Sequence, residues 1–263
     1  MTDYLNAATE AAEAAGEVLR RAYSLPREVS LKGPRDIVTD ADLAAERAIL
    51  DILTARFPEH AILSEEGKAK AGLAGDVLTW VIDPLDGTSN YAHRFPYCAV
   101  SIALVQRGQV LAGVVYDFFR GERFQAEKGH GAFRHLAGRP AEPLQVSSRT
   151  DFATALVGVG WPRDPAARQT TLRSVERLGA ACHTLRSLGT AALELAEVAA
   201  GGLDGYYHLT LQPWDVAAGA LLIQEAGGQI STPAGEPWRL GSPATAASNG
   251  LLHPTLVRTL ALD

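Results

Sequence analysis

The stretch Trp80–Pro96, which reads WVIDPLDGTSNYAHRFP, decides how this chain of 263 residues is interpreted. Residues 80–82 are apolar and predict the end of a buried strand. The strand runs into Asp83 and Asp86, and Pro84 between them fixes its own φ and favours an extended conformation at the residue before it. We therefore predict a stiff turn that presents two carboxylates at the end of a strand.

Small residues follow the second aspartate, at Gly87–Asn90. Residues of this kind let backbone N–H groups approach an anion where a helix begins. Each of these two segments has an ordinary structural interpretation, because Asp-x-x-Asp is commonly a pair of helix or turn caps and Gly-Thr-Ser is commonly a simple turn. Together they predict one loop that offers carboxylates to a cation and amides to a phosphate.

The composition is that of a soluble globular protein, with 47% apolar and 21% charged residues. The length allows one large domain or two joined lobes. A net charge of −6 argues against a nucleic-acid or anionic-membrane partner and favours a small solute. Cys98 and Cys182 are too few for a disulfide framework and lack C-x-x-C spacing, which predicts free buried thiols in a reducing compartment.

The first 17 residues contain Asp3, Glu10, Glu13 and Glu17, which the apolar region of a secretory signal would not tolerate. No uncharged apolar run approaches the roughly 20 residues of a membrane span. We therefore expect a cytoplasmic protein without a membrane partner.

The pattern of apolar residues predicts the elements in two groups. The first group begins with an Ala-rich helix over 3–24 ended by Pro26, an exposed polar loop with Lys32-Gly33-Pro34, an extended segment at 36–38 and a helix from Thr39 to Phe57. A strand at 61–63 and a mobile Gly-rich loop at 68–76 follow. The group ends with a hairpin of strands 98–105 and 110–117, strands over 118–127 and 131–134, and a surface excursion at 136–143. The second group alternates strands 155–161, 182–186 and 205–209 with helices 165–179, 188–201 and 216–226, the last entered through Pro213-Trp214-Asp215. This order predicts an antiparallel N-terminal lobe, residues 1–148, and a mixed C-terminal α/β lobe, residues 149–263, with the site between them.

The stretch from the apolar strand to His93-Arg94-Phe95-Pro96 resembles the metal-binding signature of the inositol monophosphatase family of magnesium-dependent, lithium-sensitive sugar phosphatases. Other segments agree with that family: D-x-V-T-x-x-D at 36–42, S-E-E at 64–66, and P-W-D-x-A-A-G with a Gly-Gly helix end at 213–228. The resemblance covers nearly the whole chain. It implies a layered α/β/α/β/α sandwich, usually assembled as a homodimer, and hydrolysis of a phosphate monoester of a small polyol or sugar.

The resemblance also assigns metal ligands. It implies two or three Mg²⁺ ions, the first held by Glu65, Asp83 and the Leu85 carbonyl and the second by Asp83, Asp86 and Asp215. Four carboxylates gathered in one place would raise one another's pKa values unless cations neutralise them. Because every ligand is an oxygen, the donor set favours Mg²⁺ over zinc.

The family's catalytic water would be oriented by Thr88 and Glu65, and Asp42 would belong to its hydrogen-bond network. Asp42 also fits a capping pair with Thr39, and the two roles do not exclude each other. Asp215 at a helix start fits an N-cap as an alternative. Lys32 is a candidate near the second metal, although a loop lysine is usually solvated. The residues implied in substrate binding are Asp86, Gly87, Thr88, Ser89, Ala191, His208 and Asp215.

One position departs from the family. A glutamate that reaches a ring hydroxyl of inositol is replaced by His208, and a neutral imidazole cannot bind two hydroxyls as a carboxylate does. The side chain either faces the site or ends a strand in solvent. Competing activities within the superfamily are fructose-1,6-bisphosphatase, histidinol phosphatase and nucleotide 3′-phosphatase, and the Thr88-Ser89-Asn90 sequence favours the inositol-type branch over the nucleotide branch. A non-enzymatic scaffold is the remaining alternative.

Overall fold

The computed structural model describes residues 2–25, 29–33, 36–67 and 73–261. The helices are α1 (Asp3–Tyr23), α2 (Asp40–Arg56), α3 (Thr88–Ala92), α4 (Pro165–Ala181), α5 (Ala191–Ala199), α6 (Pro213–Glu225) and α7 (His253–Leu260), with a 3₁₀ turn at Phe152–Thr154. The strands are β1 (Val29–Gly33), β2 (Asp36–Thr39), β3 (Ala61–Ser64), β4 (Thr79–Asp86), β5 (Ala99–Gln106), β6 (Gln109–Asp117), β7 (Glu122–Glu127), β8 (Ala132–Leu136), β9 (Glu142–Pro143), β10 (Leu156–Val159), β11 (Thr184–Arg186), β12 (Gly205–His208), β13 (Gln229–Ser231) and β14 (Thr245–Ser248).

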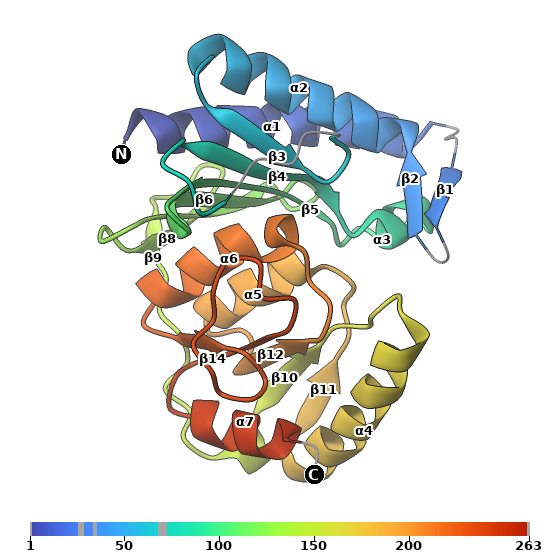
Figure 1. Cartoon of the computed structure of the whole chain (residues 1–263), viewed down its shortest axis with the longest axis vertical. Helices are drawn as coiled ribbons and strands as arrows, with labels where there is room; N and C mark the ends of the chain where they lie inside the picture. The colour runs from blue at the N-terminus through green and yellow to red at the C-terminus, as the bar shows by residue number, and fades with distance from the viewer. Residues whose placement is uncertain (1, 26–28, 34–35, 68–72, 262–263) are drawn as a thin grey trace.

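These elements stack as alternating layers of helices and sheets (Figure 1). Helices α1 and α2 cover one face of the N-terminal sheet, which consists of β3 to β9. Helices α5 and α6 fill the space between that sheet and the C-terminal sheet of β10 to β14. Helices α4 and α7 cover the outer face of the second sheet. The predicted α/β/α/β/α sandwich is therefore confirmed.

The N-terminal sheet runs in the order β3-β4-β5-β6-β7-β8-β9. From β4 onward each strand pairs antiparallel with its neighbour, as the meander predicts. The edge strand β3 instead pairs parallel with β4. The antiparallel sheet therefore has one parallel edge, which the connection over residues 65–78 is long enough to allow.

The C-terminal sheet has the order β11-β10-β12-β14-β13 and is mixed, as predicted. Strand β10 is parallel to both β11 and β12. Strand β14 is antiparallel to β12 and β13. The parallel pair matters for the site, because the ends of β10 and β12 point the same way and carry their following loops to the same edge.

Side chains of successive strand residues enter different cores. In β4, Trp80 and Ile82 pack with α1 and α2, whereas Val81 packs with α5 and α6. The core around α5 and α6 gathers residues from Leu63 to Ala247, so it takes side chains from both halves of the chain. The division into lobes at residues 148 and 149 stays a prediction.

Residues 29–33 form strand β1, which pairs antiparallel with β2. The expectation of an exposed loop around Lys32 and Gly33 was therefore wrong. The sequence Val29-Ser30-Leu31-Lys32 alternates apolar and polar residues, which is the pattern of a strand. Pro26, Pro34 and residues 68–72 of the predicted mobile loop lie outside the described residues.

The strand predicted from Phe118 begins only at Glu122. The Asp117 carboxylate explains the delay, because its Oδ1 accepts hydrogen bonds from the backbone N–H groups of Phe119 and Arg120, both at 3.0 Å, and so holds a turn. The excursion at 136–143 contains the short strand β9, which pairs with β8. Nothing in the sequence pattern led us to expect β13, β14 or α7.

Both cysteines are free and buried, as predicted. In the described part of the chain, no helix combines the length and apolar character needed to cross a membrane.

Candidate active site

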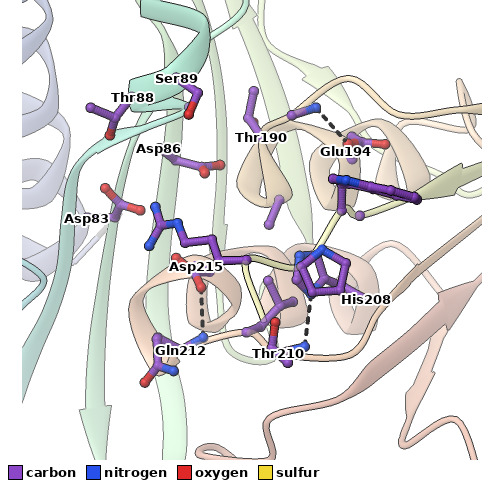
Figure 2. A pocket seen from close by; sticks show the side chains of 18 of the residues that line it. Asp83, Asp86, Thr88, Ser89, Thr190, Glu194, His208, Thr210, Gln212 and Asp215 are labelled. Atoms are coloured by element: carbon purple, nitrogen blue, oxygen red, sulfur yellow. Dashed lines mark hydrogen bonds between the residues drawn. The ribbon is translucent and has the colours of Figure 1, made fainter. Parts of the chain in front are cut away.

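A pocket of about 720 Å³ opens between the end of β4 and the ends of β10 and β12. This size suits a small organic ligand. Residues from both sheets line it, and Figure 2 shows several of them pointing toward its interior. The lining includes four carboxylates, Glu65, Asp83, Asp86 and Asp215, which we call the acidic wall. It also includes Trp161, Arg163, Arg168 and His208, which we call the distal wall.

Strand β4 supplies the centre of the acidic wall. The predicted turn is a bulge inside the strand, since the pairing with β5 shifts between Asp83 and Asp86 and the strand ends only at the second aspartate. Asp83 is 1% exposed, and its Oδ1 accepts the Leu85 N–H at 3.0 Å. Asp86 Oδ2 accepts the Ala192 N–H at 2.7 Å, which links the bulge to helix α5. The expectation of a separate turn was wrong because the bulge still closes onto β5.

Glu65 joins the wall directly after β3. Its backbone N–H donates to the Ile82 carbonyl at 3.1 Å, so the parallel pairing of β3 and β4 brings it level with Asp83. Glu66 does not line the pocket, in agreement with the prediction that only one of the two glutamates shares the site.

Asp215 enters from the first turn of α6. It is not the N-cap. Gln212 is the N-cap, and Asp215 is the third helical residue, whose Oδ2 accepts the Gln212 N–H at 2.7 Å. The helix begins earlier than predicted because proline at its first position, Pro213, is well suited to a helix start.

The three aspartates of the acidic wall have raised pKa values. Burial is the largest cause of the raised pKa of Asp83, followed by the charges of Glu65, Asp86 and Asp215. Burial raises the pKa of Asp86 to about 6, although the Ala192 N–H opposes the shift. Burial and the charge of Asp86 also raise the pKa of Asp215. A cluster of this kind favours a bound cation, because a cation removes the cost of ionising several neighbouring acids.

The donor set of the acidic wall is made of carboxylate oxygens, which fits a hard cation such as Mg²⁺. Within the described residues, no three His, Cys, Asp or Glu side chains are already arranged so that they could hold an ion together. Each of the three aspartates accepts a backbone N–H instead. The residues present therefore fit the metal in chemistry, and their side chains would have to converge to bind it.

Thr88 connects the pocket to Asp42. Its Oγ1 lies 3.2 Å from Asp42 Oδ1 and 3.1 Å from the Leu85 carbonyl oxygen, and it can donate its proton to either. Asp42 Oδ2 in turn accepts the Thr39 N–H at 2.9 Å. Asp42 therefore caps α2 and also contacts the pocket threonine, so both geometries expected from the sequence are present.

Gly87 begins helix α3 with φ = 94°, a left-handed conformation that favours glycine. A Cβ there would lie 3.2 Å from the Tyr97 carbonyl oxygen. Gly87, Thr88, Ser89 and Ala191 all line the pocket, as does Leu85. The side chain of Lys32 lies outside the described residues, so its role stays a prediction.

His208 lines the pocket and is half-buried. Of the two alternatives, this is the one in which the side chain faces the site and not the solvent. Its Nδ1 accepts the Thr210 N–H at 3.0 Å, an interaction drawn in Figure 2. Burial, together with the charge of Arg163, lowers the pKa of His208 to about 4. The imidazole is therefore neutral at pH 7, and its proton lies on Nε2.

Comparison with known proteins places this geometry in a family. The sequence pattern described as "Inositol monophosphatase family" matches residues 1–261. The chain belongs to the inositol monophosphatase family. It is a phosphoric monoester hydrolase, and members of this family are generally metal-dependent.

Among the relatives of this family member, the "Nus factor SuhB" of Escherichia coli (strain K12) is 42% identical over 234 residues, which are 88% of this chain and 85% of the relative. The "Inositol monophosphatase 3" of Solanum lycopersicum is 38% identical and covers 98% of this chain and 96% of its own. The crystal structure of the "extragenic suppressor protein suhB" from Bartonella henselae matches with a TM-score of 0.91 and 37% identity over 98% of both chains.

Sequence reasoning missed several pocket residues of this phosphatase. Thr190 caps α5 by accepting the Leu193 N–H at 3.0 Å, and Glu194 Oε1 accepts the N–H groups of Leu188 and Gly189 at 3.2 and 3.3 Å. Together they hold the turn from which Ala192 reaches Asp86. A signal was available, because a glutamate inside the apolar run ALELA of a buried helix is unusual. No local signal marked Arg163.

Proposed function

We propose that the chain hydrolyses the phosphate monoester of a small polyol or sugar, of the inositol 1-phosphate type, with the help of Mg²⁺. One observation carries the proposal. Four carboxylates from β3, β4 and α6 line the same pocket, next to the contact between Thr88 and Asp42. Carboxylates with raised pKa values in a pocket are typical of a functional site.

Glu65, Asp83 and the Leu85 carbonyl would hold one ion, and Asp83, Asp86 and Asp215 a second, with two or three ions in all. When bound, such ions lower the pKa of water and neutralise charge on the phosphoryl group. Thr88 would accept a hydrogen bond from the attacking water through Oγ1 while it donates its own proton to Asp42 Oδ1 at 3.2 Å. Glu65 would orient the same water from the other side.

The backbone around Gly87, Thr88 and Ser89 would bind the phosphate oxygens, and Ala191, His208 and Asp215 would contact the rest of the substrate. The reaction needs no covalent intermediate with the protein. Cys98, the thiol nearest the motif, is unsuited to form one, because burial raises its pKa far above neutrality.

Phosphate release tests this proposal. Wild-type protein would be assayed on inositol 1-phosphate, glycerol 2-phosphate, fructose 1,6-bisphosphate, histidinol phosphate and a nucleoside 3′-phosphate, with and without Mg²⁺. We expect Mg²⁺-dependent release that is fastest on sugar or polyol phosphates. Preference for histidinol phosphate or the nucleotide would move the chain to another branch, and no release from any compound would favour a non-enzymatic scaffold.

Three further proposals concern the setting of the enzyme. We infer that it acts in the cytoplasm, because both thiols are free. We infer a homodimer by analogy with the family, and analytical ultracentrifugation would test this oligomeric state.

The E. coli relative is named a Nus factor. For this chain we propose catalysis without a nucleic-acid partner, supported by the net charge of −6.

A further inference from the structure

The distal wall is chemically opposite to the acidic wall, although both face the same pocket. Trp161, Arg163 and Arg168 come from the segment that follows β10, and His208 ends β12. Two of these side chains are cations, and Trp161 is 44% exposed. A substrate whose phosphate lies at Asp83 and Thr88 would present its remaining part toward this wall.

The segment after β10 is held in place from two sides. The Gly160 N–H donates to the Tyr207 carbonyl at 2.8 Å, and the His208 ring lies so close that a Cβ on Gly160 would be 1.8 Å from its Cδ2. Farther along, Arg168 Nε donates to the Pro162 carbonyl at 2.7 Å. The Arg168 guanidinium also lies over the Trp161 ring, 5.6 Å from its centroid. The segment is therefore fixed by packing and hydrogen bonds.

Arg163 lies within electrostatic range of both walls. Its charge favours the ionised form of Asp215 and disfavours the protonated form of His208. The neighbouring Asp164 directs its Oδ2 to the Ala167 N–H at 2.7 Å, where it caps α4. The charge of Arg163 thus acts both on a carboxylate of the acidic wall and on the histidine of the distal wall.

His208 adds a hydrogen-bond donor to this positive region. Because Nδ1 accepts from Thr210, the remaining ring nitrogen of the neutral imidazole carries the proton and can only donate. An N–H donor near the Arg163 guanidinium, whose charge acts on the same ring, attracts hydrogen-bond acceptors and negative charge. A neutral hydroxyl would gain much less from these groups than an anion would.

We propose that the distal wall binds a second anionic group of the substrate, a phosphate or a carboxylate, at the end remote from the phosphate that is cleaved. This inference rests on the proposed function of the same pocket. Arg163 would contact the anion, with His208 as an additional donor, and Arg168 would position the segment.

Two matched pairs of substrates test the inference at saturating Mg²⁺. Glucose 1-phosphate and glucose 1,6-bisphosphate differ by a phosphate, and glycerol 2-phosphate and 2-phosphoglycerate differ by a carboxylate. kcat/KM would be measured for wild type, Arg163→Gln, Arg163→Lys and His208→Glu. Arg173→Gln is the control, because Arg173 is an exposed residue of α4 that binds Thr170 and does not line the pocket.

In at least one pair, we expect the kcat/KM of wild type to be about tenfold or more higher for the substrate with a second anionic group. This is the size of effect that a charged hydrogen bond supplies. The pair that shows the preference identifies the anion. Arg163→Gln should remove the preference, while kcat/KM for the substrates with one anionic group changes less than about threefold. His208→Glu should also remove the preference, because it places a carboxylate where the anion would bind. Arg163→Lys should retain part of it, and Arg173→Gln all of it.

The inference falls if wild type hydrolyses both members of each pair equally well. It also falls if Arg163→Gln lowers kcat/KM equally for every substrate, because the arginine would then serve only as a counter-ion of Asp215. If wild type hydrolyses none of the four compounds or the wider panel, the proposed function itself is wrong.

Discussion

The two walls of the pocket differ in how the chain builds them. The acidic wall consists of residues at the ends of β3 and β4 and in the first turn of α6, and its aspartates accept backbone N–H groups. The distal wall consists mainly of a segment between β10 and α4, held by Gly160, His208 and Arg168. The acidic wall, at the ends of strands and the start of a helix, carries the groups that suit the reaction. The distal wall, mainly on a connecting segment, carries the groups that suit selection of the substrate.

The largest expected effect lies on the acidic wall. Asp83→Asn should lower Mg²⁺-dependent phosphate release by at least about a hundredfold, because it removes a ligand shared by both proposed ions. The thermal midpoint without metal should stay equal or rise, since the amide relieves repulsion from Glu65, Asp86 and Asp215. Asp76→Asn, at an exposed residue that pairs with Arg107, is the matched control. Near-normal turnover of Asp83→Asn would refute the assignment.

Removal of the Thr88 hydroxyl should have the next largest effect. Thr88→Ala should lower kcat by about a hundredfold with little change in KM, because the hydroxyl would act on the water rather than on the bound substrate. Thr54→Ala is the control, since Thr54 is exposed on α2 and its hydroxyl donates to the Leu50 carbonyl of the same helix. A rise in KM at constant kcat would assign Thr88 to substrate binding instead.

Gly160→Ala tests the packing that holds the distal wall. The new Cβ would overlap the His208 ring, so the protein should lose about 1–3 kcal/mol of stability and change its substrate preference. Gly179→Ala is the control, because the nearest atom to a Cβ at Gly179 is 3.8 Å away. Urea unfolding and kcat/KM measure the two effects. An unchanged midpoint and unchanged preferences would show that the ring is not fixed against Gly160.

Glu194, which holds the turn before α5, predicts a pH dependence of stability. Burial raises its pKa from 4.5 to about 8, so the folded protein retains a proton that the unfolded chain releases between these values. Its contribution to stability is complete below pH 4.5 and is lost as the pH rises toward 8. Without metal, Glu194→Gln should therefore lose less stability than wild type over this range, by an amount on the order of 1 kcal/mol or more. Parallel stability curves for the two proteins would contradict this.

The smallest expected effect is inhibition by lithium. At fixed Mg²⁺, Li⁺ at tens of millimolar, roughly the range in which a weakly held monovalent ion competes, should inhibit partially. Because the competition belongs to the acidic wall, Arg163→Gln should be inhibited by the same concentration. Indifference of wild type to Li⁺ would indicate a divergent branch of the family.

The acidic wall was predictable because its aspartates lie in recognisable local sequence motifs. Asp83 and Asp86 stand together after an apolar strand, and Asp215 stands in a Pro-Trp-Asp sequence at a helix start. Their exact settings were harder to predict. Whether Asp83 lies in a turn or in a bulge depends on pairing with β5, and the position of Asp215 depends on where α6 begins.

The distal wall was not predictable in the same way. Arg163 lies in the short polar sequence WPRD, and only the parallel pairing of β10 with β12 brings it to the pocket beside His208. The strands near the C-terminus were missed for a related reason. β13 and β14 have three and four residues, too few for a periodic pattern, and they form by pairing, β14 with β12 and β13 with β14. Non-local pairing therefore decides the features that local sequence does not.

The location of bound metal tests the central claim most directly. Crystals grown with Mn²⁺ in place of Mg²⁺ would reveal each ion by its anomalous scattering. We predict one ion bound by Glu65, Asp83 and the Leu85 carbonyl, and a second bound by Asp83, Asp86 and Asp215, with the three aspartates released from their backbone N–H partners where needed. Ions bound elsewhere, or an acidic wall without ions at millimolar Mn²⁺, would contradict the account.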